Sequence, residues 1–321
     1  KNFDNLKKKN VFKQSIDKGF LIDFKELEKN QYPETLKKYN VILKAKKISF
    51  ISYPYEWSFD QLKDAALHHI KFQIFLLELN CVLRDSSAFN IQFFEGKPIF
   101  IDIMSLKEYE EGEYWSGYKQ FCENFLNPLL IGDLKNIEHN NLIRSSIEGL
   151  DTILLNKILN IKNKISLNVF THVVLQSKFL EQDIKNPKAT REKKNKLKKF
   201  KKSSYVFMLN QLKIWISKLD LKKNQSTWGK YENCNTYTEK SLSEKEKIVS
   251  QFVEKTQPNK LIDLGCNNGQ FSKIAIANGA KEVVGIDFDI NAISNTYKIS
   301  KKDNLNLLPL YIDLSNPSPN Q

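Results

Sequence analysis

An apolar run, a glycine turn and a helical pattern follow one another near the C-terminus and leave little choice of local fold. Residues 261–264 (LIDL) form the run, residues 265–269 (GCNNG) form the turn, and apolar residues recur at helical spacing from Phe271 onward. Further apolar runs follow at 282–286 and 307–312. Alternation of strands and helices is typical of a parallel sheet. We therefore predict an α/β segment here, part of a Rossmann-like, doubly wound parallel sheet.

Acidic residues stand where the strands of this sheet are expected to end. Asp287 closes the second strand and Asp313 follows the third. Ligands of such sheets bind beyond the carboxyl ends of the strands, where a carboxylate accepts hydrogen bonds from ribose hydroxyls. Gly265 and Gly269 let the backbone pass close to a ligand. The pattern is DxGxxxG rather than GxGxxG, which favours a positively charged cofactor over a pyrophosphate.

At these residues, from Leu261 to about Pro319, the chain resembles the class I S-adenosylmethionine-dependent methyltransferases. The resemblance implies S-adenosyl-L-methionine as cofactor, with Asp287 on its ribose and Asp313 near its adenine. The turn expected to lie under the cofactor's amino-acid part contains Asp263, Gly265, Cys266, Asn267 and Gly269. Asn267 departs from the glycine of many family members, and Cys266 is expected to pack as a small residue. The alternative is that these are turn glycines of another α/β sheet.

Only 34 residues follow Asp287, whereas the sheet of that family continues with further strands. The first residue is Lys1 rather than methionine. We therefore expect a chain that is incomplete at both ends, and the sequence assigns neither a methyl acceptor nor a catalytic residue.

A second pattern lies in the N-terminal half. Ser58 and Gln61 fit a capping box, and the helix that follows is predicted to continue to about Leu83. A DxxxxN loop comes next, followed by a hairpin, IQFF-EGKP-IFIDI, whose second strand is expected to end at Asp102.

This order of elements resembles the catalytic core of protein kinase-like and aminoglycoside kinase-like folds. The resemblance implies Asp85 as catalytic base, Asn90 as a metal ligand and Asp102 as the magnesium ligand. Ile103-Met104 replaces the usual Phe-Gly, and no glycine-rich loop precedes the helix. We therefore expect a degenerate scaffold in which Asp85 and Asn90 shape a loop, with a bifunctional, phosphotransferase-active protein as the alternative. The strings SYPYEWSF, LRDSSAFN and FIDIMS also resemble a subgroup of bacterial methyltransferases that carry this segment before the cofactor domain.

Basic residues crowd one tract and suggest a division of the chain. Between Lys185 and Lys202, ten residues are Lys or Arg and only Glu192 is acidic. We predict a kinase-like, largely helical α+β N-terminal domain at 1–182, a basic linker at 183–204 and a partial methyltransferase domain at 205–321. The net charge of +13 comes almost wholly from lysine, whereas arginine is best suited to phosphate recognition. A lysine-coated surface is therefore favoured over the alternative, a nucleic-acid-binding module that uses the tract.

Several other classes of protein do not fit the sequence. No apolar stretch is long enough to span a bilayer, and the four cysteines lie far apart without a CxxC pattern. His68 and His69 lie within a predicted helix with no ligand-spaced partner, so a metal site is not expected. A further helix is expected from about Ser243 to Glu254, with Ser243 and Glu246 as its capping box. Together these features predict a cytoplasmic methyltransferase.

Overall fold

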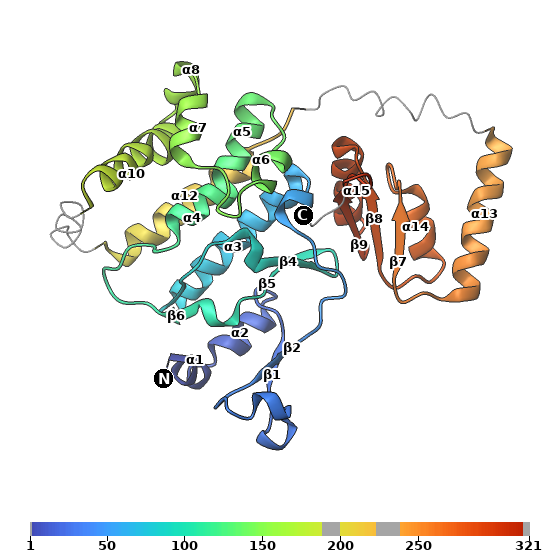
Figure 1. Cartoon of the computed structure of the whole chain (residues 1–321), viewed down its shortest axis with the longest axis horizontal. Coiled ribbons are helices and arrows are strands. Elements are labelled where there is room, and N and C mark those ends of the chain that lie inside the picture. The colour runs from blue at the N-terminus through green and yellow to red at the C-terminus, as the bar shows by residue number, and fades with distance from the viewer. Residues whose placement is uncertain (1, 188–199, 223–237, 317–321) are drawn as a thin grey trace.

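The computed structural model of the chain describes residues 2–187, 200–222 and 238–316 (Figure 1). Most of the predicted basic linker, 188–199, lies outside the described residues. The helices are α1 (Asn2–Lys8), α2 (Val11–Asp17), α3 (Phe59–Glu78), α4 (Tyr118–Phe121), α5 (Asn127–Lys135), α6 (Asn140–Arg144), α7 (Thr152–Ile158), α8 (Ile161–Lys164), α9 (Leu167–Val169), α10 (Gln176–Lys185), α12 (Lys202–Lys218), α13 (Glu239–Thr256), α14 (Gln270–Ala277) and α15 (Ile290–Lys302). The strands are β1 (Phe24–Glu26), β2 (Leu43–Ala45), β3 (Cys81–Leu83), β4 (Ile91–Phe94), β5 (Lys97–Phe100), β6 (Leu106–Glu108), β7 (Leu261–Leu264), β8 (Val283–Asp287) and β9 (Leu307–Tyr311).

Helix α3 is the central element of the N-terminal half. The predicted capping box is confirmed: the backbone N–H of Gln61 donates to Ser58 Oγ, and Gln61 Oε1 accepts from the Ser58 N–H. The helix ends at Glu78, earlier than predicted, because Asn80 adopts a left-handed φ of 54° and the chain continues as β3. Helix α12 packs along α3, where Gln73 Nε2 donates to the hydroxyl of Tyr205 at 2.7 Å. Helix α12, which lies mostly in the predicted methyltransferase domain, thus belongs to the core around α3. The division of the chain at 205 stays a prediction.

The strands of the N-terminal half form antiparallel pairs. The predicted hairpin is confirmed as β4 paired with β5, and Glu95 and Gly96 take up the positive φ angles that its tight turn requires. Strand β5 ends at Phe100 rather than at Asp102, which instead caps a short 3₁₀ turn. Strand β3 pairs with β6, and β1 pairs with β2.

The C-terminal half contains a parallel sheet in the order β7-β8-β9. Each strand coincides, to within about one residue, with one of the apolar runs noted in the sequence. Helix α13 begins at Glu239 and is capped by Thr238, which accepts from the Ser241 N–H, so the predicted capping box at Ser243 is wrong. The observed fold is therefore mixed α/β, as predicted at that level.

The two faces of this sheet contribute to different cores. Val284, Ile286 and Leu308 belong to the large core built around α3, whereas Val283 and Leu307 pack with α13 and α14 in a smaller one. Figure 1 shows α15 at the side of the sheet that is turned toward the N-terminal half. The C-terminal sheet is thus packed on the N-terminal half through apolar side chains.

Candidate functional site

The glycine turn lies at the carboxyl end of β7 and opens toward solvent at one residue. Gly265 has a φ of 75°, and a Cβ built there would meet nothing within 4 Å. Gly269 has a φ of 71°, and its Cβ would lie 2.7 Å from Thr296 Cγ2 on α15. Gly265 therefore leaves space beside the backbone, whereas Gly269 permits close packing of two helices. This second role differs from the predicted one, in which both glycines face a ligand.

Asp287 lies against this turn. Its Oδ2 atom accepts a hydrogen bond from the Asn267 backbone N–H at 2.9 Å, and its Oδ1 atom accepts from the Asp289 N–H at 2.9 Å. Asn267 can make this contact because it adopts a left-handed φ of 47°, which asparagine tolerates better than most residues. Each carboxylate oxygen has two acceptor positions, so these bonds leave capacity for a diol.

The other acid and the cysteine of the turn have structural surroundings. Asp263 Oδ2 accepts from Ser272 Oγ at 2.7 Å and so fastens α14 to β7. Cys266 is buried, and its Sγ atom packs beside Gly285. Burial, with the charges of Asp263 and Asp287, raises the pKa of the Cys266 thiol, which keeps it protonated.

Asp313 follows the neighbouring strand β9 and is exposed. Its carboxylate accepts from the backbone N–H and the hydroxyl of Ser315, and these hydrogen bonds, with the charge of Arg144, hold its pKa below the usual value. Asp287 is the register partner of Tyr311, two residues before Asp313. The structure thus brings the glycine turn, Asp287 and Asp313 to one end of one sheet.

Helix α15 connects this end of the sheet to the N-terminal half. Asp289, the second residue after Asp287 in the sequence, caps the helix, and Thr296 Oγ1 donates to the carbonyl oxygen of Asn267 at 3.0 Å. At the next residue, the hydroxyl of Tyr297 donates to Asp64 on α3 at 2.7 Å. The helix therefore touches the turn, the strand end and α3.

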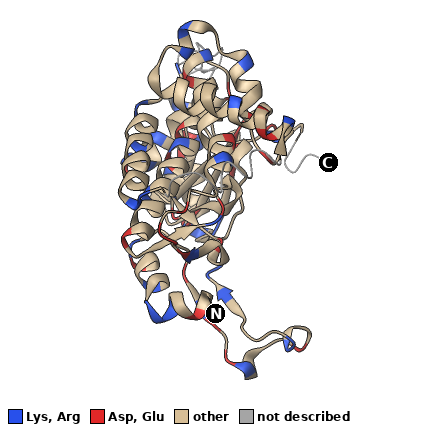
Figure 2. Ribbon diagram, turned by 90° about the vertical axis from the view of Figure 1, so that its left-hand side faces the viewer, with Lys and Arg blue, Asp and Glu red and all other residues tan. Residues whose placement is uncertain are grey.

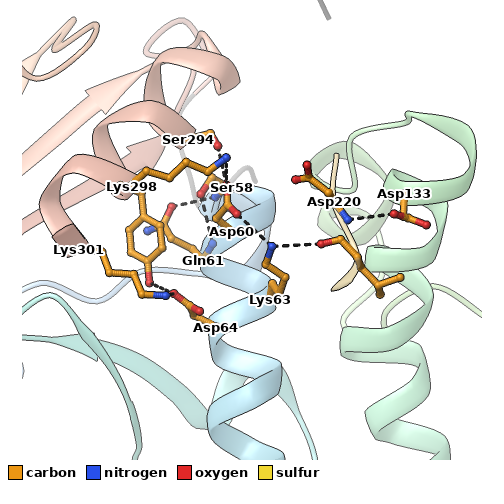
Figure 3. A network of polar contacts seen from close by, with 12 residues as sticks. Ser58, Asp60, Gln61, Lys63, Asp64, Asp133, Asp220, Ser294, Lys298 and Lys301 are labelled. Carbon is orange, nitrogen blue, oxygen red and sulfur yellow. Dashed lines mark hydrogen bonds and ion pairs between the residues drawn. The ribbon is translucent and has the colours of Figure 1, made fainter. Parts of the chain in front are cut away.

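Two acids of α3 form the polar part of this junction (Figure 3). Asp60 accepts from Ser294 at 2.8 Å and pairs with Lys298 at 3.0 Å, and Asp64 pairs with Lys301 at 2.6 Å. Asp60 and Asp64 are one helical turn apart, and neither is predicted as a site residue from the sequence. Acids at that spacing are common on solvated helix faces, so the sequence carries no signal for their role.

The predicted kinase-like residues lie in turns that contact one another mainly through backbone groups. The backbone N–H of Asp85 donates to Ser105 Oγ at 3.0 Å, while its side chain is exposed. Asp102 Oδ1 accepts from the Met104 N–H at 3.1 Å, and the carbonyl of Asn90 accepts from the Ile101 N–H. Within the described residues, no group of three His, Cys, Asp or Glu side chains is placed to hold a metal ion.

The two helix histidines lie in apolar surroundings. His68 Nε2 lies 3.0 Å from the carbonyl oxygen of Phe20, and burial lowers the His68 pKa to about 4. His69 is packed among aromatic rings that include Trp115 and Phe121, and burial lowers its pKa to about 3. Both rings are therefore neutral near pH 7.

Charge and hydropathy complete the description of the surface. Figure 2 shows Lys and Arg on elements from one end of the molecule to the other rather than on one element. In the part of the chain that the structure describes, every helix is too short or too polar to cross a bilayer.

One comparison with known proteins gives a match. The chain is 38% identical over 313 residues to nodulation protein NoeA of Rhizobium meliloti (strain 1021). The matched region covers 97% of this chain and 65% of that relative, so the chain spans about two thirds of the relative's length. No protein-family model matches the chain, and no solved structure matches it. The likeness to NoeA is therefore one of sequence, and the name of that relative states no reaction.

Proposed function

We propose that the chain carries the cofactor-binding part of an S-adenosylmethionine-dependent methyltransferase, with the N-terminal half as a scaffold. The observation that carries the proposal is the hydrogen bond from the Asn267 N–H to Asp287 Oδ2 at 2.9 Å. It holds an acid, at the end of one parallel strand, against the glycine turn that ends the neighbouring strand. A ribose bound to that acid would extend its 5′ substituent over the turn, as ligands of doubly wound sheets do.

The chemistry of the site supports a sulfonium cofactor over a dinucleotide. Asp263, Asp287 and Asp313 all lie at this end of the sheet, so a pyrophosphate would meet three carboxylates, of which Asp313 has the charge of Arg144 nearby. A methyl donor that carries a positive sulfonium and an ammonium group would meet complementary charge. Methyl transfer itself is an in-line displacement that depends on positioning of the acceptor, and the acceptor stays unassigned.

Calorimetry with S-adenosylmethionine and S-adenosylhomocysteine tests the proposal. Asp287→Ala should weaken binding of both by more than about tenfold, because a charged hydrogen-bond acceptor for the ribose is lost. Asp303→Ala is the matched control, since that acid is exposed at the end of α15. Absence of binding by the unaltered chain, or equal affinity in Asp287→Ala, would overturn the proposal.

The alternative functions have less support from the described residues. Most of the basic tract of the nucleic-acid alternative lies outside the described residues, Asp102 caps its own turn, and the Asp85 side chain is exposed. The name of the relative refers to nodulation. Because neither alternative has a supporting contact in the described residues, we propose only the methyltransferase. That the complete protein is active as a methyltransferase is part of the same proposal.

A further inference from the structure

A small cavity lies where the N-terminal half meets the end of β9. It has a volume of about 160 Å³, and its walls come from both halves of the chain. The N-terminal half contributes residues of the turn before α3 and of α6, and the sheet contributes the end of β9. The lining includes Tyr55, Glu56, Arg144, Tyr311 and Asp313. A cavity of this size is below the range of pockets that enclose a whole drug-sized ligand, so it suits one planar group.

The cavity adjoins the proposed ribose position. Tyr311 is the register partner of Asp287, and the backbone N–H of Ile312 donates to the Asp287 carbonyl oxygen at 3.0 Å. Neighbouring strands lie about 4.8 Å apart, which is close to the span from a ribose hydroxyl to the attached base. A nucleoside whose sugar lies on Asp287 can therefore reach the cavity with its base.

The N-terminal wall is held in place by hydrogen bonds between segments that are distant in sequence. Asn140 Nδ2 donates to the carbonyl oxygens of Tyr55 and Trp57, each at 2.9 Å, which fixes α6 to the turn before α3. Arg144 donates to the Asn316 carbonyl oxygen at 3.0 Å, and its guanidinium lies 6.0 Å from the centroid of the Tyr55 ring. The position of the wall is therefore fixed by the protein's own hydrogen bonds.

The chemical groups of the cavity match a purine with an exocyclic amine. Aromatic rings of Tyr55 and Tyr311 offer apolar surface, the Asp313 carboxylate accepts hydrogen bonds, and the Arg144 guanidinium donates them. An adenine presents one amino donor beside a ring-nitrogen acceptor, which is the complement of a carboxylate beside a guanidinium. An inosine presents a carbonyl and a protonated ring nitrogen, which reverses both contacts.

We infer that Tyr55 and Arg144 bind the adenine base of the cofactor, so that the N-terminal half supplies one wall of the cofactor site. The inference rests on the proposed function, because it takes the ribose on Asp287 as its starting point. It gives the N-terminal half a direct part in cofactor selection, beyond that of a scaffold. Tyr55 lies in the string SYPYEWSF, but no local pattern connects either Tyr55 or Arg144 with the sheet, since both lie far from it along the chain.

Calorimetry with S-adenosylhomocysteine and S-inosylhomocysteine tests the inference on the full chain. The unaltered protein should prefer the adenosyl compound by about tenfold or more, the expected worth of one charged hydrogen bond. Arg144→Ala should weaken adenosyl binding by about tenfold and reduce the preference to less than about threefold. Tyr55→Ala should weaken both compounds, because it removes apolar surface. Arg84→Ala is the matched control, since Arg84 is exposed and does not line the cavity.

The outcomes separate this inference from the proposed function. Adenosyl binding that Asp287→Ala weakens and Arg144→Ala leaves unchanged would overturn the inference and keep the function. An equal loss for both compounds in Arg144→Ala would assign the arginine a structural role and also overturn it. Absence of binding by the unaltered protein would remove the function, and the inference with it.

Discussion

The two halves of the molecule use their predicted acids differently. In the C-terminal half, Asp287 and Asp313 stand at the ends of adjacent parallel strands, and Asp287 contacts a turn that is distant in sequence. In the N-terminal half, Asp102 caps its own short turn and the Asp85 side chain is exposed. Parallel strands bring their carboxyl ends to one edge, so acids that follow them converge. Acids in separate loops have no such constraint: the Asp102 carboxylate bonds within its own turn, and Asp85 reaches that turn only through its backbone N–H, which donates to Ser105 Oγ.

The histidines sharpen this comparison and give the largest expected effect. All four histidines of the chain, His68, His69, His139 and His172, lie in the N-terminal half. Burial lowers the pKa of His69 to about 3 and of the other three to about 4, against 6.5 for the unfolded chain. The unfolded chain therefore binds more protons, so stability is fully present above about pH 6.5 and is lost as pH falls toward 4.

Each histidine should lower the free energy of unfolding by about 2 kcal/mol at pH 5 relative to neutral pH. Acidification should therefore lower it by several kcal/mol in all. Buried Glu123 and partly buried Glu138, whose pKa values are raised by burial, act in the opposite direction. Urea titrations of wild type and His69→Leu at pH 7 and pH 5 measure the effect. Between the two pH values, the free energy of unfolding of the variant should fall by about 2 kcal/mol less than that of wild type. A packing change affects the variant at both pH values and therefore cancels in this comparison. Equal losses would show that His69 is protonated in the folded protein.

A medium effect is expected at the glycine turn, where the C-terminal half depends on close packing. Gly269→Ala should lower the free energy of unfolding by about 2–4 kcal/mol, from the left-handed backbone and the clash with Thr296 Cγ2. Gly265→Ala has the same backbone strain without a neighbour, so about 1–2 kcal/mol is expected. In a Thr296→Ser background the methyl group is absent, but the hydroxyl oxygen stays 3.3 Å from the added Cβ, so the difference between the two glycine variants should shrink. An unchanged difference there would contradict the packing explanation.

Much of the C-terminal half could be predicted from the sequence. The three strands were visible as apolar runs, and the turn was visible because Gly265 and Gly269 bracket it. In the N-terminal half, the capping box at Ser58 and the hairpin turn at Glu95-Gly96 could also be predicted from short sequence patterns. In each case the controlling residues lie within a few positions of one another, so local propensity and local hydrogen bonds decide the structure.

The remaining features depend on contacts that are distant in sequence. The pairing of Asp60 and Asp64 with α15 joins residues more than two hundred positions apart, and the cavity beside Arg144 joins α6 to β9. The role of Gly269 against Thr296 also needed the packing of α15. No periodicity reports such contacts. The early end of α3 was missed because an apolar strand follows Asn80 without a break in hydropathy.

The smallest effects are expected at the kinase-like acids, and they test the other side of the comparison. Asp102→Ala removes the acceptor for the Met104 N–H and should cost about 0.5–1 kcal/mol of unfolding free energy. Asp85→Ala should change it by less than about 0.5 kcal/mol, because the side chain is exposed. Neither should alter S-adenosylhomocysteine affinity. Magnesium-dependent ATP hydrolysis that disappears in Asp102→Ala and Asp85→Ala would show instead that these loops converge on a substrate, and the two halves would then share the property that separates them here.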